Sequence, residues 1–532
     1  MPDLVLRDGV VWTGVEGRET AEAVAISEGR IVAVGSNSTI DPLSDDSTRV
    51  VQLAGRAVTP GFIDAHTHFV SGGFQLSSID LRDADTPEEF ADRIESFAAG
   101  APPGTWITGG GWDHELWGGE LPQRRWIDAR TPDHPVFVQR LDIHMALANR
   151  VALQAAGVTS ATEDPPGGSI VRDEHGEPTG ILKDEAMDLV LRVMPTRTER
   201  QLDEALDAAA HHALSLGVTQ IHDMGSWANL ATYQRAQTQG RLPLRVYSVV
   251  PMRDWERMRD YVAEHGVGGD RLWWGAVKAF VDGSLGSTTA WFHEPYSDAP
   301  DSTGLVVTDP SDLSRWILGA DAAGLHVIVH AIGDRANDWL LDTYAGVATT
   351  NGDRDRRFRI EHAQHLTADA IGRFAEQGVI ASMQPFHAAD DGRWAEKRVG
   401  AERIRTTYPF RSLLDAGATL AFGSDWTVAP LDPIVGIDAA VSRRTLDGMH
   451  PEGWIPEQRI PLEDTLRAYT SGAARSGFME DRVGTVENGK LADLVVLSRD
   501  VFAMDPHDLG DVRVDITIVD GQVAYERPSA RE

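Results

Sequence analysis

Residues 61–68 have the sequence Gly61-Phe62-Ile63-Asp64-Ala65-His66-Thr67-His68, and this segment decides the fold. The apolar run that precedes the histidines is typical of a buried strand. Side chains two apart on a strand point to the same face, so His66 and His68 are able to bind one metal ion together. A His-x-His pair is common by chance, and two ordinary polar residues at a strand end are the alternative interpretation. Other features of the sequence are needed to choose between a metal-binding pair and two ordinary polar residues.

The central part of the chain alternates between short apolar runs and helical segments, which is the pattern of a parallel sheet or barrel. Glu199 to Leu216, with its Ala-rich periodicity, is one of the predicted helices. Eight apolar runs that end in polar residues are predicted as strands, and they indicate an α/β fold of the (β/α)8 barrel type. The runs are residues 58–68, 218–224, 244–250, 274–280, 326–330, 359–362, 380–384 and 419–425.

The two ends of the chain and the segment that follows the first barrel strand do not show this simple alternation of strands and helices. Residues near both termini form short β-prone runs, separated by turn sequences such as Asp8-Gly9 and Asp520-Gly521. Two edge-rich sheets, one at each end, are marginal alone, so we expect residues 1–58 and 483–532 to pack into one composite β-sandwich. The barrel then spans residues 59–482. Residues 70–200 are too many for one crossover helix and contain strand-like runs (105–110, 135–140 and 170–171), so we expect an inserted subdomain over the barrel mouth.

Several predicted barrel strands end in residues with metal-ligand chemistry. The carboxyl ends of barrel strands converge on one site, and imidazole and carboxylate groups suit zinc and related divalent ions. Taken singly, each histidine is explained as an ordinary hydrogen-bonded side chain and Asp425 as a helix cap. Their succession favours a metal site in which Asp425 takes a proton from the attacking water. The residues at these strand ends are His66, His68, Lys278, His330, His362 and Asp425.

Lys278 lies in an apolar strand, where a buried ammonium group is costly. A neutral lysine amine adds CO2 to form a carbamate, an anionic ligand that bridges two metal ions, whereas arginine does not lose its proton readily enough. The alternative is a lysine paired with nearby Asp282. The chain uses arginine for nearly all of its 49 basic residues, and its only lysines are Lys183, Lys278, Lys397 and Lys490.

The overall composition excludes several classes of function. A formal net charge of −32 argues against nucleic acid and anionic membrane surfaces as partners. The chain has no cysteine, which excludes disulfides, cysteine nucleophiles and thiolate metal ligands. The start of the sequence has no signal-peptide pattern, and no apolar run approaches the roughly 20 residues of a membrane span. We therefore expect a cytoplasmic protein.

These motifs together resemble the amidohydrolase superfamily, and within it the amidohydrolase family 3 branch of YtcJ-like proteins, which includes N-substituted formamide deformylases. The resemblance covers nearly the whole chain, with the motifs in the right order. It implies a distorted TIM-like barrel with a composite β-sandwich and a divalent metal centre, usually zinc. The motifs are residues 59–68, Lys278 with Asp282-Gly283-Ser284, residues 330–334, Glu361-His362 and Gly423-Ser424-Asp425.

The resemblance also implies roles for single residues. Asp425 is the implied catalytic group, because it carries a proton to the leaving amine as well as binding metal. Lys278 is implied as a carboxylated bridge, with Glu185 of the insertion as its competitor, and the number of ions, one or two, stays open. Barrels of this superfamily are often dimers, so a homodimer is expected. The implied metal ligands are His66, His68, Lys278, His330, His362 and Asp425, and the candidate substrate contacts are His144, His222 and Asp282.

The expected function is hydrolysis of a C–N bond in a small molecule, such as an N-formyl, N-acyl or cyclic amide. Two alternatives keep the same metal site: cleavage of an ester or lactone, and deamination of a heterocycle. A barrel that only binds a ligand, as a sensor or regulator, is the non-catalytic alternative. The complete set of ligand positions argues against it.

Overall fold

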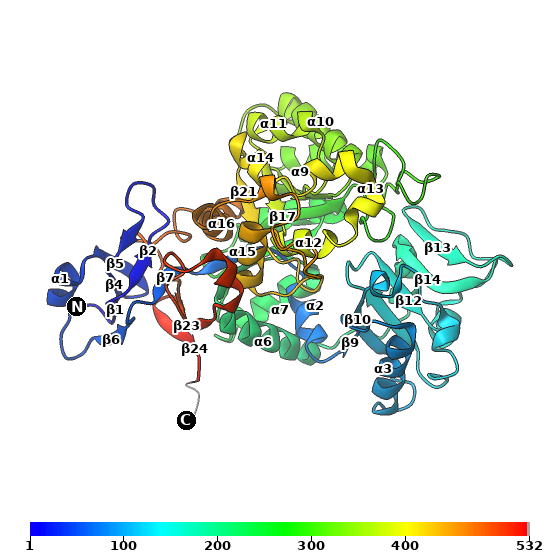
Figure 1. Cartoon of the computed structure of the whole chain (residues 1–532), viewed down its shortest axis with the longest axis horizontal. Coiled ribbons are helices and arrows are strands. Elements are labelled where there is room, and N and C mark those ends of the chain that lie inside the picture. Colours follow the sequence, from blue (N-terminus) through cyan, green and yellow to red (C-terminus); the bar gives the residue numbers. More distant parts are fainter. Residues whose placement is uncertain (529–532) are drawn as a thin grey trace.

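The computed structural model describes residues 1–528, in which a nearly closed barrel of eight parallel strands lies between two smaller units (Figure 1). The predicted α/β barrel is therefore confirmed. The strand order is β21-β20-β19-β18-β17-β16-β15-β8. The strands are β8 (Phe62–Thr67), β15 (Val218–Met224), β16 (Arg245–Pro251), β17 (Leu272–Phe280), β18 (His326–Ala331), β19 (Arg359–His362), β20 (Ile380–Met383) and β21 (Leu420–Phe422).

The barrel closes between β21 and β8 through the backbone that follows β21. The N–H of Asp425 donates to the carbonyl of His66 at 2.7 Å, and the N–H of His68 donates to the carbonyl of Trp426 at 2.6 Å. The predicted strand over residues 419–425 is too long, since β21 ends at Phe422 and Asp425 has a left-handed φ of 59°. This closure places Asp425 directly against the two histidines.

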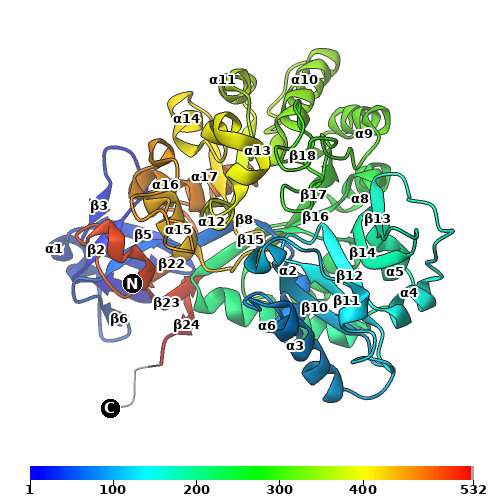
Figure 2. The same ribbon diagram turned by 45° about the vertical axis from the view of Figure 1, so that its right-hand side comes forward.

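Helices cover the outside of the barrel (Figure 2). The predicted helix over residues 199–216 is confirmed as α6 (Glu199–Ser215), which Thr198 caps by accepting a hydrogen bond from the backbone N–H of Gln201. Its buried residues recur at helical spacing and face the barrel. The other covering helices are α7 (Trp227–Thr238), α8 (Trp255–His265), α9 (Pro310–Ala322), α10 (Asp334–Asn351), α11 (Ala368–Gln377), α14 (Phe410–Asp415) and α16 (Leu462–Tyr469).

Two sheets near the chain termini share one apolar core, in which Leu6 and Ile26 pack with Val496 and Ile518. The expectation of one sheet from each terminus is wrong, because the C-terminal strands join N-terminal strands in a single sheet. Antiparallel pairing of β7 with β22 protects both strands from solvent. One sheet consists of β5 (Arg30–Gly35), β4 (Ala23–Ser27), β1 (Leu4–Arg7) and β6 (Arg49–Gln52). The other consists of β24 (Gln522–Glu526), β23 (Val514–Val519), β22 (Leu494–Leu497), β7 (Ala57–Pro60), β2 (Val10–Trp12) and β3 (Thr20–Ala21).

The predicted strand over residues 58–68 is two strands, β7 in a terminal sheet and β8 in the barrel. Gly61 lies between them, and its N–H donates to the carbonyl of Asp493 at 2.8 Å. A Cβ atom at Gly61 would lie 2.2 Å from Oγ1 of Thr219, so a larger residue does not fit. One extended run of chain thus passes from the terminal sheet into the barrel.

A six-stranded sheet forms between β8 and α6, beside the barrel and far from the terminal sheets (Figure 1). Three of its strands match the predicted ones at 105–110, 135–140 and 170–171. The prediction missed the three others, one of which, Pro178–Asp184, is the longest strand of the sheet with 7 residues. Helix α3 (Pro87–Ala99) packs against it. The strands are β13 (Gly168–Arg172), β14 (Pro178–Asp184), β12 (Met145–Ala148), β11 (Val136–Arg140), β10 (Ile107–Trp112) and β9 (Ile79–Asp80).

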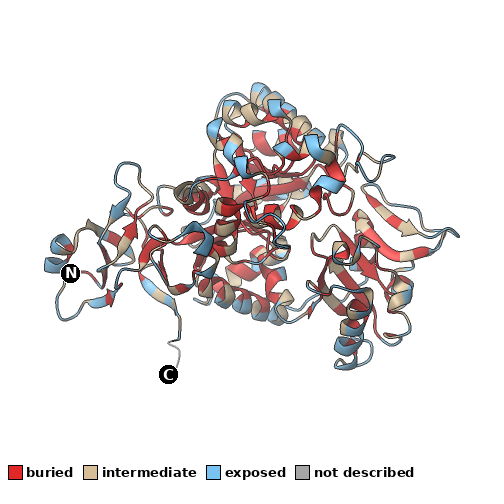
Figure 3. Ribbon diagram, viewed as in Figure 1, coloured by how far each residue is buried: buried red, intermediate tan, exposed pale blue. Residues whose placement is uncertain are grey.

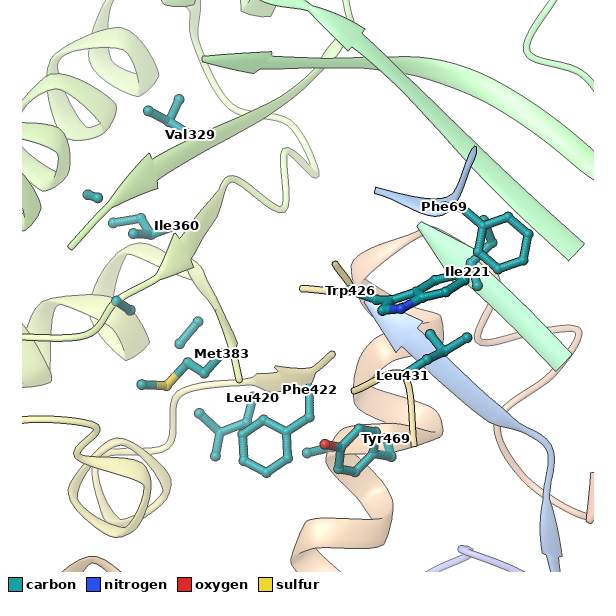
Figure 4. Packing of buried hydrophobic residues seen from close by; sticks show 14 of the residues in the cluster. Phe69, Ile221, Val329, Ile360, Met383, Leu420, Phe422, Trp426, Leu431 and Tyr469 are labelled. Carbon is teal, nitrogen blue, oxygen red and sulfur yellow. The ribbon is translucent and has the colours of Figure 1, made fainter. Parts of the chain in front are cut away.

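Buried residues concentrate along the barrel strands and on the inner faces of the helices (Figure 3). Near the barrel closure, the rings of Phe69 and Trp426 pack edge to face with centroids 5.9 Å apart (Figure 4). This contact holds α2 (Phe69–Gln75), which directly follows His68, against the chain after Asp425. Among residues 1–528, no helix has both the length and the apolar character needed to cross a bilayer.

Candidate active site

One cavity at the carboxyl ends of the barrel strands contains all six predicted metal ligands. The side chains come from β8, β17, β18 and β19 and from the turns that follow β8 and β21. On the opposite side, residues 140–144 of the insertion complete the wall. The six residues are His66, His68, Lys278, His330, His362 and Asp425.

Asp425 lies at the centre of the ligand group. Its Oδ1 atom is 3.4 Å from Nε2 of His66 and 3.3 Å from Nε2 of His68. One ligand atom each from His66, His362 and Asp425 lie within 4.8 Å of one another. Donor atoms bound to one zinc ion at about 2 Å each are at most about 4 Å apart, so a small contraction would let these atoms share an ion. Within residues 1–528, nothing donates a hydrogen bond to this buried oxygen, which leaves it available as a ligand.

A hydrogen bond to one ring nitrogen fixes the orientation of three of the histidines. Nδ1 of His66 lies 2.6 Å from Oε2 of Glu361, and Nδ1 of His362 lies 2.8 Å from Oε1 of Gln384. In His330 the bonded atom is Nε2, which lies 2.9 Å from the carbonyl of Gly283. Each ring therefore presents its other nitrogen as a ligand atom, the usual arrangement around a bound metal.

The same histidines are held in the neutral form that binds metal. Burial lowers the pKa of His66 to about 4, against the opposing effects of Asp425 and Glu361. Burial, reinforced by neighbouring imidazole, lowers the pKa values of His330 and His362 well below the usual value. Burial would raise the pKa of Asp425, but His66, His68 and His362 outweigh it and keep this carboxyl ionised. The site thus combines neutral imidazoles with a carboxylate.

Glu361 supports this arrangement from behind the ligands, in a fully buried position. Arg359 Nε donates to its Oε1 at 2.9 Å, and Ser382 Oγ donates to its Oε2 at 2.8 Å. Burial opposes ionisation, but Arg359 and His66 keep the pKa of Glu361 well below its usual range. Glu361 was predicted only as part of a motif, and the contact of Gln384 was not predicted. The sequence feature that points to the ion pair of Arg359 and Glu361 is their spacing, because residues two apart on a strand share one face.

Lys278 is buried, and among residues 1–528 no group accepts a hydrogen bond from its Nζ atom. The ammonium position lies 4.7 Å from the ring centroid of Phe280. Burial lowers the pKa of Lys278 to about 8, although Glu361 and Asp425 raise it. The alternative pairing with Asp282 is wrong, because Asp282 accepts backbone hydrogen bonds from Trp291, Ile332 and Gly333 instead.

The three candidate substrate contacts have different surroundings. His144 lines the cavity, and its Nδ1 lies 2.6 Å from Oδ1 of Asp184. Burial opposes protonation, but Asp184 raises the pKa of His144. His222 lies deeper in the barrel, where Arg359 Nη1 donates to its Nδ1 at 2.9 Å. The structure places neither His222, Asp282 nor the competing ligand Glu185 in the lining of the cavity.

Other polar residues of the cavity were not predicted. Arg140 and Asp142 form a buried ion pair at 2.8 Å, and Ser287 Oγ donates to Asp142 at 3.0 Å. On the barrel side, Tyr408 OH donates to Asp391 at 2.6 Å, and burial raises the pKa of Asp391 to about 7. The sequence signal for the first pair was the polar cluster at residues 140–144, of which only His144 was singled out.

Several known proteins are similar to this chain in sequence. Residues 49–525 match the family described as "Amidohydrolase family". The chain is 44% identical over 519 residues to "Protein LONG AFTER FAR-RED 3" of Arabidopsis thaliana, covering 94% of this chain and 89% of that protein. It is 32% identical over 532 residues to "Putative amidohydrolase YtcJ" of Bacillus subtilis, covering 98% of each. It is 28% identical over 548 residues to "N-substituted formamide deformylase" of Arthrobacter pascens, covering 99% of each.

A solved structure shares the whole architecture. An uncharacterized metal-dependent hydrolase from Pyrococcus horikoshii superposes with a TM-score of 0.76 at 30% identity, covering 95% of this chain and 99% of that one. The similarity therefore extends over the terminal sheets and the insertion as well as the barrel. The predicted resemblance is confirmed: this chain belongs to the amidohydrolase family.

Proposed function

We propose that the protein is a metal-dependent hydrolase that cleaves the C–N bond of a small amide with water. The observation that carries the proposal is the convergence of four histidines, one lysine and one aspartate on a single cavity at the barrel mouth. Membership in the amidohydrolase family supports the reaction class. The relative named N-substituted formamide deformylase makes N-formyl and other N-acyl amides the first substrates to test.

The side chains of the site fit a divalent metal, and we propose zinc. His66, His68, His330, His362 and Asp425 offer nitrogen and carboxylate oxygen, the ligands that zinc accepts when cysteine is absent. The buried, unpartnered Oδ1 of Asp425 is the observation that tests this fit within residues 1–528. Such an ion supplies two effects, a lowered pKa of water and polarisation of a carbonyl group.

Lys278 is proposed to carry a carbamate. Its neutral nitrogen attacks the carbon of CO2, an N–C bond forms, and one N–H proton leaves to solvent, so that the side chain becomes an anion. The lowered pKa makes the neutral amine accessible near pH 8. The anion would give the site a second charged ligand beside Asp425, which would help to hold a second ion.

Asp425 is proposed as the group that moves the proton. Its carboxylate is ionised and lies within 3.4 Å of two ligand histidines, so it is adjacent to any water held there. It accepts a proton as the water oxygen forms a bond to the amide carbon, and it returns that proton to the nitrogen as the C–N bond breaks. The products are a carboxylic acid and an amine. His144, on the insertion side, is proposed to contact the substrate.

The test is a substrate panel with purified protein loaded with zinc in the presence of bicarbonate. Hydrolysis of at least one amide is expected, and Asp425→Asn is expected to keep bound metal while kcat falls by about 10²–10⁴-fold. Asp415→Asn, at an exposed position on α14, is the matched control and is expected to be fully active. Activity only on esters, lactones or heterocycles would replace the amide reaction. Elemental analysis that finds no tightly bound metal would favour a ligand-binding regulator.

A further inference from the structure

A second cavity lies between the insertion and the barrel, and it shares Arg140, Leu141 and Ile143 with the active-site cavity. We call it the side chamber. Its apolar wall comes from both units, with Val70, Phe74 and Leu202 from the barrel side and Phe137 from the insertion. The three shared residues make the two spaces neighbours across a single short loop.

This loop, residues 141–144, separates polar from apolar surroundings. Asp142 and His144 line only the active-site cavity, where Ser287 and Asp184 hold them. Ile143 lines both spaces and has a φ of 55°, which is strained for a β-branched residue. Strain of this kind persists where the surrounding contacts enforce it, and it is common at functional sites. Here the strained residue is Ile143, which lies at the boundary of the two cavities between its polar neighbours Asp142 and His144.

The side chamber also differs from the active-site cavity in charge. In a protein with 81 acidic residues, no Asp or Glu of residues 1–528 lines it. The active-site cavity, in contrast, contains Asp142, Asp390, Asp391 and Asp425. The charged groups of the side chamber are Arg140 and Arg197, and the Arg197 guanidinium lies 4.7 Å from the ring centroid of Phe74. The Arg140 charge is already paired with Asp142 at 2.8 Å, so the apolar wall accepts an uncharged group, and the lack of carboxylates among the described lining residues disfavours a cation.

Two glycines of β10 line the side chamber, and only Gly111 leaves space in it, because a Cβ atom at Gly109 would lie 2.6 Å from Cβ of Ser78. Gly109 and Gly111 have φ values of 111° and 81°, a conformation that favours glycine. A Cβ atom at Gly111 would meet only one neighbouring atom, at 3.7 Å, so the missing side chain leaves open volume rather than tight packing.

We propose that the side chamber binds an uncharged apolar arm of the substrate while the scissile amide lies in the active-site cavity. This inference rests on the proposed hydrolysis of amides and names the substrate class: amides that carry an extended apolar substituent. The loop at residues 141–144 then acts as the boundary that the substrate crosses, with Ile143 in contact with the arm.

The experiment compares linear N-alkylformamides and N-methyl acylamides of increasing chain length. In the wild type, kcat/KM is expected to rise by up to about fourfold per methylene, the factor expected for burial of one methylene group. Replacing the terminal methyl group by an ammonium group is expected to abolish the rise. Ala228→Trp, which fills the side chamber from α7, should remove the length dependence and leave the shortest substrate unchanged. Ala231→Trp, at an exposed position of the same helix outside the side chamber, is the matched control.

Each other outcome overturns the inference. A flat wild-type series would show that no arm is bound, and an equal loss at all chain lengths in Ala228→Trp would show a passage rather than a binding site. Saturation-transfer NMR with 1-hexanol tests the side chamber without turnover. The signal should be present in the wild type and Ala231→Trp and absent in Ala228→Trp, and equal signals would contradict the proposal. If no amide is hydrolysed, the proposed function fails, and the NMR comparison still decides the inference.

Discussion

Replacing Lys278 by methionine is expected to stabilise the metal-free protein while it abolishes hydrolysis. Burial lowers the pKa of Lys278 from 10.5 to about 8, so folding disfavours the charged amine. A shift of this size corresponds to about 3 kcal/mol of folding free energy when both states are protonated. Methionine has a side chain of similar length and no charge, so it removes this cost.

The stabilisation should depend on pH with a definite sign. Below pH 8 the lysine is protonated in both states and the full cost is present. Between pH 8 and pH 10.5 the folded protein loses this proton while the unfolded chain keeps it, so wild-type stability rises with pH. The advantage of Lys278→Met is therefore largest at pH 7 and smaller at about pH 9.5.

Urea unfolding of chelator-treated, CO2-depleted protein at both pH values measures the effect. Lys490→Met is the matched control, because Lys490 Nζ donates to the carbonyl of Glu480 at 2.7 Å and lies 3.3 Å from Glu487. Losing these partners should cost about 1 kcal/mol. The reasoning would be refuted if Lys278→Met destabilised the metal-free protein, or if its gain were the same at both pH values.

Three further predictions test buried charged groups of the protein. Glu361→Gln removes the charge beside His66 and should weaken metal binding by about 10–100-fold. Competition with a chromogenic chelator measures the metal affinity, and Ser382→Ala should lower it less. An unchanged affinity in Glu361→Gln would contradict the prediction. Arg245 donates to buried Asp493 through Nε at 2.6 Å and through Nη2 at 2.9 Å, and Arg245→Leu removes both hydrogen bonds. The free energy of unfolding, measured with urea, should fall by about 3–5 kcal/mol. An unchanged free energy of unfolding would show that this ion pair does not stabilise the fold. Because the pKa of Asp391 is raised from 3.8 to about 7, its contribution makes the wild type less stable as pH rises through this range, by up to about 4 kcal/mol. Asp391→Asn should flatten that dependence, and an unchanged pH profile would exclude the effect.

The convergence of the six candidate ligand side chains on one cavity was predictable from local features. Each follows or ends an apolar run, and parallel strands bring such positions together. The same rule failed for His222, whose ring accepts a hydrogen bond from Arg359 and packs against Tyr247 and Trp273 instead of lining the cavity. It failed also for Asp282, two residues beyond the end of β17, where backbone N–H groups of a neighbouring loop surround the carboxylate.

The partners of the ligands were harder to predict than the ligands. Gln384 reaches His362 from the next strand, and Glu361 reaches His66 from the other side of the barrel, 295 residues away in sequence. Such contacts depend on strand register, which apolar patterning does not determine across parallel neighbours. The change of sheet at Gly61 was also not predictable from apolar patterning, because the chain is extended on both sides of this residue and the pattern does not show which strands each side pairs with.

The junction at Gly61 has a mechanical consequence. Pro60 is paired with Leu494 in the terminal sheet, and Phe62 is paired with Val218 in the barrel, so a single residue separates the two pairings. The Gly61 N–H also donates to the carbonyl of Asp493 at 2.8 Å, so the junction residue itself is held by the terminal sheet. The terminal sheets therefore support the strand that carries His66. The loop of residues 141–144 lines the cavity from the opposite side, so a movement of that loop would change access to the site without disturbing this junction.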